Sequence, residues 1–509
     1  MPHATGGSTP QLVLGADLST DSLKWIVVNV ATGEVVAQNS FAFLKAFGEF
    51  FGLRKGGFLE LGDGAVRIPY GLFPAAIHTM LGQVTEALGD DRQYLRRIVV
   101  SVQQHGKVAW RKGRRLDQLA GLNHMDLLGQ FDGLFANDYA TSWMDTSSAP
   151  DCTRLEELQP PDWWAQLTGS SPGQSLRFLG PQIARSARLT NTHDNTSMYT
   201  VLASLVGSIL TGRKAGIGMD EASATLLMDL ASGTWAEAQL QGYFPKGTFD
   251  KLPTILSPGA NLGRLWSHHV RLHGLPETCE VLLGLGDNIA IQLTMAGEDG
   301  AFGVSLGSSG TGYAERSTPG WDPQHRCHVL RSAAGKFLVL SCTAFCGKAA
   351  NDVREMAGLE WTDFDRLVAQ PQWDDSEALV LPGKGGNFTF RNVRPASTDV
   401  AAAVTRGIVG VVRTQSMSLV PSPPAVVLTG GFASKPVAQV VADVFQAPVH
   451  LSGKVNRVAL GSCILGVASV TGEPLPAAAA RLAPKAERIE PDLSRAEFYA
   501  SMIDSMSQQ

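Results

Sequence analysis

The sequence predicts an α/β fold made of two similar halves, and two observations carry that prediction. Residues 12–20 and 303–311 are each a short apolar run that ends in a turn of glycine and hydroxyl-bearing residues, and a second strand-like run follows each turn. Beyond these two β-hairpins, strand-length apolar runs alternate with segments of helical spacing. Because a single core stops growing at roughly 250–300 residues, a chain of 509 residues is expected to form two or more domains.

The first half opens with two strand-like runs between Leu12 and Val36, which flank a turn at Ser19–Ser22; Ala31–Glu34 forms a second tight turn. The apolar run Arg97–Val102 is typical of a buried strand. Helical spacing predicts helices over Pro74–Leu88, Asp151–Leu158, Asp162–Leu167, Gln182–Arg188 and Val201–Leu210. Two segments lack a clear period, so we expect an irregular surface insertion at 43–75 and a loop at 120–142.

A stretch rich in proline and glycine at 244–260 predicts a domain boundary near residues 250–260. We therefore expect an N-terminal domain over 12–255, a C-terminal domain over 256–485 and a tail over 486–509 that is partly helical. The second half repeats the plan of the first, with expected strands at 280–285, 300–315 (a hairpin), 336–341 and 425–428, and expected helices around 348–370, 399–417, 435–446 and 459–472.

Composition excludes several classes of protein. A formal net charge of −5 and a pI near 6.1 argue against a surface for nucleic acid or for an anionic membrane. Residues 1–11 contain no apolar targeting segment, and no run of about 18 apolar residues could span a membrane. The six cysteines are scattered, and Cys342 and Cys346 have no second pair to complete a zinc site. We expect a cytoplasmic protein with reduced cysteines.

The turn Gly15-Ala-Asp17-Leu-Ser-Thr20 predicts a phosphate site. Small residues let backbone N–H groups approach phosphate oxygens, and Ser19 and Thr20 add hydroxyls. Asp17, at the end of the strand, is a suitable Mg²⁺ ligand, because Mg²⁺ prefers carboxylate oxygens and keeps several waters. The competing interpretation is an ordinary hairpin turn.

The second turn, Ser305–Gly310, contains two glycines and three serines, so it too is lined with hydrogen-bond donors. The alternative is a flexible hairpin tip, but the pairing with the first turn favours a phosphate site. Gly430 and Gly431 follow the apolar run 426–429 and could let an adenine ring lie against the backbone. Glycine pairs are common in turns, so Gly430 and Gly431 alone are weak evidence for an adenine site.

Two further motifs follow predicted buried strands and carry polar side chains. Asp287 and Asn288 lie where α/β sheets bind ligands, so Asp287 could accept a hydroxyl proton while Asn288 orients the same molecule. The alternative for Asp287 is a helix cap. Gln103-Gln-His105-Gly106 follows the strand at 97–102, and its amide and imidazole groups suit sugar hydroxyls; a purely structural histidine is the alternative.

From Leu12 to Gly472 the ordered series of motifs resembles the FGGY carbohydrate kinases of the actin/hexokinase ATPase superfamily, and within them the xylulokinases. The segments that carry the resemblance are Asp17–Thr20, Gln103–Gly106, Trp143–Asp145 with the downstream Cys152, Leu167–Gly169, Arg177–Phe178, Gly286–Asn288, Ser305–Gly310, Thr429–Gly431, Val441–Phe445 and Ala459–Gly461. No single motif is decisive, whereas their order and spacing are specific.

This resemblance implies two ribonuclease-H-like domains with an active cleft between them. It also implies ATP- and Mg²⁺-dependent phosphorylation of a ketose in pentose catabolism, with D-xylulose giving D-xylulose 5-phosphate. The implied roles are a general base at Asp287, sugar contacts at His105, Arg177, Asp287 and Asn288, a Mg²⁺ position at Asp17, phosphate contacts at Ser19, Thr20, Gly307, Ser308 and Ser309, and adenosine contacts at Gly430, Gly431 and Ser434. A monomer or a homodimer is expected.

The sequence departs from the family pattern at three places. Ser19 stands where many members have glycine, Lys435 stands where glycerol-kinase-like members place an adenine-contacting asparagine, and the 43–75 insertion could reshape the rim of the sugar pocket. Asp220 matches a recurrent family segment, and we expect it to have a structural role.

Three alternatives remain open at this stage. The first is a kinase for ribulose, another ketose or a polyol. The second is a sugar- or nucleotide-binding protein without catalysis, which the intact Asp17 and Asp287 disfavour. The third is a dinucleotide-dependent oxidoreductase, which would need the Gly-x-Gly-x-x-Gly pattern that the chain lacks after Gly15.

Overall fold

A computed structural model of the chain describes residues 10–295, 300–307, 309–343, 346–370, 378–382, 388–394, 399–417, 420–453 and 455–507. The chain forms two compact units. The first contains residues 1–297, 330–336 and 456–483, and the second contains 298–329, 337–455 and 484–509. This division differs from the expected boundary near 250–260, because the strands that follow the Pro/Gly-rich stretch join the first sheet and residues 456–483 return to the first unit.

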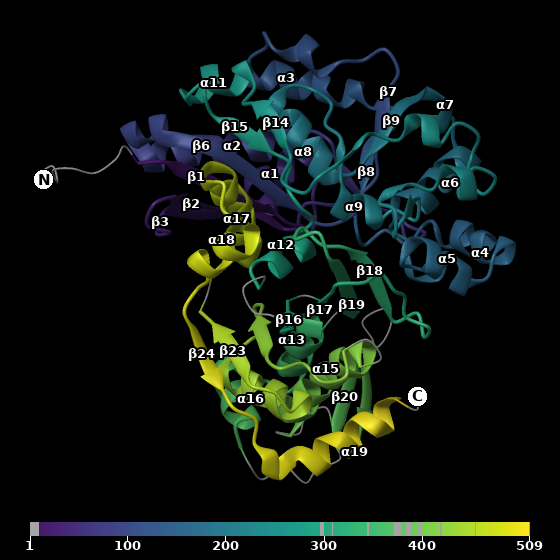
Figure 1. Cartoon of the computed structure of the whole chain (residues 1–509), viewed down its shortest axis with the longest axis vertical. Coiled ribbons are helices and arrows are strands. Elements are labelled where there is room, and N and C mark those ends of the chain that lie inside the picture. The colour runs from purple at the N-terminus through teal and green to yellow at the C-terminus, as the bar shows by residue number, and fades with distance from the viewer. Residues whose placement is uncertain are drawn as a thin grey trace, which may run out of the picture. The chain divides into compact units, whose positions relative to one another are not determined.

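The first unit is built on a six-stranded mixed sheet in the order β14-β15-β6-β1-β2-β3 (Figure 1). Its strands are β1 (Leu12–Leu18), β2 (Ser22–Asn29), β3 (Val35–Ala42), β6 (Leu95–Val102), β14 (Asn261–Arg264) and β15 (Glu280–Leu282). β1, β2 and β3 are antiparallel neighbours, whereas β1, β6 and β15 run parallel to one another. The carboxyl ends of these three parallel strands therefore meet at one edge of the sheet.

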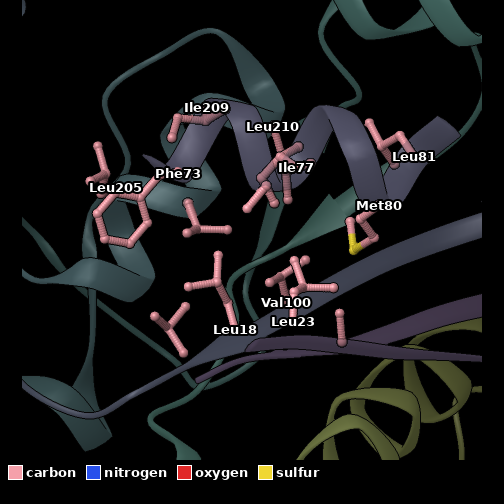
Figure 2. Close-up of a cluster of buried hydrophobic side chains, with 14 of the residues drawn as sticks. Leu18, Leu23, Phe73, Ile77, Met80, Leu81, Val100, Leu205, Ile209 and Leu210 are labelled. Atoms are coloured by element: carbon pink, nitrogen blue, oxygen red, sulfur yellow. The ribbon is translucent and has the colours of Figure 1, made fainter. Parts of the chain in front are cut away.

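The main core of this unit covers one face of the sheet. The helices α2 (Leu72–Leu88) and α8 (Leu202–Thr211) lie over it, and Figure 2 shows their side chains meeting those of the strands. From α2 these are Phe73, Ile77, Met80 and Leu81, from α8 Leu205, Ile209 and Leu210, and from the strands Leu18, Leu23 and Val100. The spacing of the α2 residues is that of one helical stripe, which explains why this helix was predictable.

The opposite face of the sheet is covered by α17 (Arg457–Thr471), a helix from the far end of the chain. Glycines make this packing close: a Cβ at Gly15 of β1 would overlap the carbonyl oxygen of Ala459, and a Cβ at Gly466 of α17 would overlap Val13. Ser462 Oγ donates a hydrogen bond of 3.1 Å to the Ala16 carbonyl. β1 is thus buried on both faces along its whole length.

The second unit repeats the arrangement of the first. Its main sheet has the order β18-β19-β17-β16-β22-β23-β24, with strands β16 (Phe302–Leu306), β17 (Gly310–Arg316), β18 (Cys327–Arg331), β19 (Phe337–Thr343), β22 (Val426–Thr429), β23 (Val449–Ser452) and β24 (Ala486–Ile489). β16 forms an antiparallel hairpin with β17 and runs parallel to β22, as β1 does with β2 and β6. The two expected hairpins are confirmed, each at the centre of a similar sheet.

The remaining elements surround these two sheets. In the first unit they are α1 (Phe43–Phe51), β4 (Leu59–Glu60), β5 (Val66–Pro69), β7 (Val108–Arg111), α3 (His124–Phe131), β8 (Tyr139–Thr141), α4 (Ala149–Leu158), α5 (Pro161–Thr168), α6 (Leu179–Leu189), α7 (Thr192–Asn195), β9 (Thr196–Thr200), β10 (Ile217–Gly218), α9 (Met219–Ser223), β11 (Met228–Asp229), β12 (Thr234–Trp235), α10 (Glu237–Leu240), β13 (Ile255–Leu256), α11 (Ser267–His273), α12 (Asp287–Leu293) and α18 (Leu475–Leu482). In the second they are α13 (Cys346–Met356), α14 (Trp361–Val368), β20 (Leu379–Pro382), β21 (Phe388–Arg391), α15 (Val400–Ser416), α16 (Lys435–Phe445) and α19 (Ala496–Ser507).

Two expectations about irregular segments are wrong. Residues 43–75 form a helix, two short strands and the start of α2, and residues 120–142 contain α3 and β8. In α1 the rings of Phe43, Phe47 and Phe51 follow one another at intervals of four residues, with centroid separations of 6.4 and 6.2 Å. These ring contacts hold a helix whose sequence also contains a glycine and has no capping side chain.

The described part of the chain also bears on the class of protein. None of its helices is both long and apolar enough to cross a bilayer. All six cysteines are free thiols, five of them buried and Cys342 partly exposed, as expected for reduced cysteines.

Candidate active site

The candidate site of the first unit lies where β1, β6 and β15 end. In the sheet Leu18 is opposite Val102, and Val102 pairs in parallel with Gly286. The Gln103 N–H donates to the Leu18 carbonyl at 3.0 Å, and the Val102 N–H donates to the Leu285 carbonyl at 3.0 Å. The backbone therefore brings together three of the predicted motifs: 15–20, 103–106 and 284–288.

Asp17 is buried at the end of β1, with 3% of its surface exposed. Asn456 donates to its Oδ2 at 2.8 Å, and Lys24 Nζ lies 3.7 Å from the same oxygen. Its Oδ1 is buried and has no hydrogen-bond partner among the residues that the structure describes. Burial raises the pKa of Asp17, and the charge of Lys24 and the Asn456 hydrogen bond partly offset that rise. A buried, unpartnered carboxylate oxygen beside a partial counter-charge is suited to an external cation.

Asp287 is the first residue of α12 and is partly exposed. Its Oδ1 accepts three hydrogen bonds, from the backbone N–H groups of Gln104 (3.2 Å) and Asn288 (2.8 Å) and from Asn288 Nδ2 (3.1 Å). Asn288 Nδ2 also donates to Gln104 Oε1 at 3.0 Å. Burial raises the pKa of Asp287 to about 7, and the negative charge of Asp17 adds to the rise. Such a carboxyl can exchange a proton near neutral pH.

His105 adopts a left-handed backbone conformation with φ of 71°, and Gly106 follows with φ of 86°. This turn leaves the imidazole 4.6 Å from the ring of Phe178 in a stacked arrangement. The central carbon of the Arg177 guanidinium lies 6.0 Å from the centroid of the same Phe178 ring. The predicted sugar-contacting residues His105 and Arg177 thus share one aromatic neighbour, although they are far apart in sequence.

Two consecutive buried acids of α9 lie next to this site. Asp220 is 0% exposed and Glu221 is 2% exposed. The Glu221 carboxyl accepts a hydrogen bond from the His105 backbone N–H, and a Cβ on Gly286 would overlap its Oε1. Burial raises the pKa of Asp220 to about 7; burial and the charges of Asp220 and Asp287 raise the pKa of Glu221 well above its ordinary value.

Ser19 and Thr20 form the turn after Asp17 and are partly exposed. The Ser19 backbone N–H and Oγ both donate to the Ser22 carbonyl, at 3.0 and 3.1 Å. Thr20 Oγ1 accepts from Trp143 Nε1 at 2.8 Å. Both donors of Ser19 are thus engaged within the turn, so a phosphate contact by this residue would require its hydroxyl to turn away from Ser22.

The second unit carries the other predicted phosphate turn at the tip of β16–β17. Gly307 and Ser309 are partly exposed there, whereas Ser308 lies outside the described residues. The Gly307 N–H donates to the Ser309 carbonyl at 3.0 Å, and the Gly307 carbonyl accepts from the Gly347 N–H at 2.9 Å. The first bond closes the turn, and the second connects it to the start of α13.

The glycine pair after β22 packs directly on this hairpin. Gly430 has φ of 109°, and a Cβ there would overlap the Leu306 carbonyl. Gly431 is exposed, with open space where a side chain would be. Ser434 precedes α16, and its Oγ donates to Asp365 at 2.7 Å. Lys435 is mostly exposed and pairs with Glu487. The structure thus brings the predicted adenosine turn next to the predicted phosphate turn.

Sequence reasoning missed three contributors. Asn456 caps α17 and reaches Asp17, Gln104 connects to both Asp287 and Asn288, and Glu221 touches two motif loops. Gln104 lay inside a motif that was singled out, and Glu221 is the second of two adjacent acids in an apolar stretch. Nothing local marks Asn456, because its contact spans most of the chain.

No protein-family model matches the sequence. Among curated relatives, the "Probable D-xylulose kinase A" of Aspergillus clavatus is 27% identical over 515 residues, covering 90% of this chain and 87% of that protein. The protein of the same name from Aspergillus terreus is 28% identical over 397 residues, covering 74% and 67%.

Solved structures share the fold over nearly the whole chain. The xylulose kinase of Rhodospirillum rubrum superimposes with a TM-score of 0.79 at 19% identity, covering 98% of both chains. The glycerol kinase of Plasmodium falciparum, solved with ADP, gives a TM-score of 0.79 at 14% identity, again covering 98% of both. The expected fold, two ribonuclease-H-like domains of the actin/hexokinase type, is confirmed.

Proposed function

We propose that this chain is an ATP-dependent sugar kinase that phosphorylates a ketose, with D-xylulose as its substrate. One observation carries the proposal: Asp287 stands at the junction of three strand ends with all three of its described hydrogen bonds on Oδ1, which leaves Oδ2 to accept a substrate proton. The curated relatives named as probable D-xylulose kinases support the substrate.

In this reaction the sugar hydroxyl oxygen forms a bond to the γ-phosphorus, and the bond from that phosphorus to the oxygen of the leaving ADP breaks. The hydroxyl proton passes to Asp287 Oδ2. Such a base contributes about 10²–10⁴-fold to the rate, or roughly 3–5 kcal/mol of barrier. Asn288 holds the carboxylate through its side-chain amide, while His105 and Arg177 orient the sugar so that the hydroxyl is in line with the phosphorus.

The residues present fit a magnesium ion at Asp17. Among the described residues no group of three or more His, Cys, Asp or Glu side chains could hold a metal by itself. Mg²⁺ does not require one, because it is commonly bound by one or two carboxylates together with substrate phosphates and waters. Asp17 supplies a buried oxygen without a partner for such a site. When bound, the ion would neutralise charge on the phosphates.

For the nucleotide, the exposed turns of the second unit are the candidates. Gly307, Ser308 and Ser309 would contact phosphates, as Ser19 and Thr20 would from the first unit. Gly430, Gly431 and Ser434 would contact adenosine. The open space beside Gly431 supports this assignment, because a flat ring can lie against backbone that has no side chain.

The test is ATP turnover over a panel of pentuloses, hexuloses and polyols, with gluconate and glycerol included because structural neighbours bear those names. D-xylulose should give the highest kcat/KM. Asp287→Ala should lower kcat by at least about 10²-fold while ATP binding persists.

Asp151→Asn is the matched control, because Asp151 is a buried carboxylate of the same unit that pairs with Arg188 on the α4–α6 surface. That variant should keep its kcat. Turnover by Asp287→Ala at the normal rate would exclude the base assignment, and no turnover of any sugar by the wild type would favour a binding protein.

A further inference from the structure

Glu221 is a buried acid that none of the roles above uses. It lies on the short helix α9, where Ser223 Oγ donates to the Asp220 carbonyl at 2.6 Å and accepts from the Arg331 N–H at 2.9 Å. The side chain is 2% exposed. A carboxyl placed so far from water needs either a partner or a proton.

The carboxyl of Glu221 touches two loops of the candidate site. On one side it accepts the His105 backbone N–H. His105 is a non-glycine residue at φ of 71°, a conformation that costs on the order of 1–3 kcal/mol and persists only where the surroundings hold it. The Glu221 hydrogen bond is one contact that holds it.

On the other side the carboxyl occupies the space next to Gly286. A Cβ on Gly286 would overlap Glu221 Oε1 and crowd Gln104, so a side chain at this position would displace the acid from its contact with the backbone. Gly286 immediately precedes Asp287. One side chain therefore lies against the residue before the proposed base and against the backbone of the proposed sugar contact.

The groups that act electrostatically on Glu221 are both acids: Asp220 on its own helix and Asp287 on the facing loop. His105 meets it through the backbone N–H. Within the described part of the chain no cation shifts the pKa of Glu221, so a charge on Glu221 would be opposed by burial and by both neighbours. Burial and both neighbouring carboxylates therefore favour the protonated form of Glu221.

We propose that Glu221 is a positioning residue that works as an uncharged carboxylic acid, joining the loop 103–106 to the loop 284–288 and so fixing His105 relative to Asp287. The expected effect of Glu221 on sugar turnover rests on the proposed function, whereas its expected effect on the two loops does not. It predicts that the shape and hydrogen-bonding capacity of the side chain matter, whereas its ability to ionise does not.

The kinetic test compares Glu221→Gln with Glu221→Ala. Glutamine keeps the shape and is permanently neutral, so it should retain most of the activity that alanine loses and leave the pH profile of kcat/KM unchanged. Alanine removes the brace and should lower kcat/KM for the sugar by about 10- to 100-fold, the loss that a misplacement of about 1 Å causes, with the KM for ATP unaltered. Equal losses in both variants would overturn the proposal, as would full activity in Glu221→Ala.

The structural test needs no turnover. Hydrogen–deuterium exchange should rise in peptides covering 103–106 and 284–288 in Glu221→Ala, or in the shorter Glu221→Asp if alanine prevents folding. Peptides from 426–445 in the other unit are the control, and Glu221→Gln should match the wild type. Unchanged exchange at both loops would overturn the bracing role. If the wild type phosphorylates no sugar, the proposed function fails, and the exchange data still decide the role of Glu221.

Discussion

The acid side of the pH–rate profile should report the raised pKa of Asp287. The perturbation is a change of pH between 8 and 5 at saturating ATP. The measured quantity is kcat/KM for the sugar, because that ratio follows the ionisation of the enzyme before the sugar binds. Burial and the charge of Asp17 raise the pKa of Asp287 to about 7. A base must be ionised to accept a proton, so activity is lost as pH falls through that value.

The size of the loss follows from that pKa. A carboxyl that titrates at about 7 is roughly 90% ionised at pH 8, roughly 10% at pH 6 and about 1% at pH 5, whereas a carboxyl near its ordinary value of about 3.9 stays almost fully ionised at pH 6. We therefore expect kcat/KM to fall roughly tenfold between pH 8 and pH 6.

The assay is discontinuous measurement of ADP, which avoids the pH dependence of coupling enzymes, and samples returned to pH 8 must recover their activity. Asp220 also titrates near pH 7, so Asp220→Asn is the control in which the acid limb must persist. A flat profile between pH 8 and pH 6 in the wild type would refute the reasoning, because it would mean that the base is ionised throughout.

Three further predictions concern binding and stability. Arg177→Ala should raise the KM for the sugar by about 10- to 100-fold, the effect of losing one charged hydrogen bond, and an unchanged KM would remove Arg177 from the pocket. Lys107 is buried against Ser186, and burial together with nearby arginines lowers its pKa to about 7. Because the unfolded chain keeps that proton up to about pH 10, the free energy of unfolding of the wild type should rise between pH 7 and pH 9.5. In urea titrations Lys107→Met should show a much smaller rise with pH. An equal rise in the variant would mean that Lys107 is solvated in the wild type. Gly284→Ala should lower Tm, since its Cβ would overlap the backbone oxygen of Val100. Gly82→Ala on α2, where no atom of the described residues lies within 4 Å of the new Cβ, should be neutral or stabilising. Similar Tm values for the two variants would show that the backbone at Gly284 can yield.

Apolar periodicity in the sequence predicted the elements that bury one face or both faces of a regular strand or helix. The hairpins, the strand at 97–102 and most helices were predictable because apolar periodicity marks buried faces. The helix α1 was missed because its phenylalanines at 43, 47 and 51 are interrupted by a glycine and by the exposed Phe50, which obscures the helical spacing. The expected boundary at 255 differs from the structure because β14 and β15 pair across long sequence distances.

The candidate site was predictable in the same partial way. Asp17 lies at the end of a buried strand, and His105 and Asp287 each follow one; parallel neighbours bring such strand ends together. Their common location follows from the sheet, which a motif scan can anticipate. The roles of Glu221 and Asn456 depend on where α9 and α17 pack, and no spacing in the sequence specifies those contacts.

The return of residues 456–483 to the first unit also constrains the order in which the protein can fold. During synthesis β1 leaves the ribosome early, but the helix α17 that covers one of its faces is made only after most of the second unit. An apolar sheet face without its covering helix is prone to misassembly, so the first unit reaches its native state late. A fragment that ends at 297 would lack both that helix and the Asn456 hydrogen bond to Asp17. The first unit can be produced alone only if 456–483 is supplied with it, on the same chain or as a separate peptide.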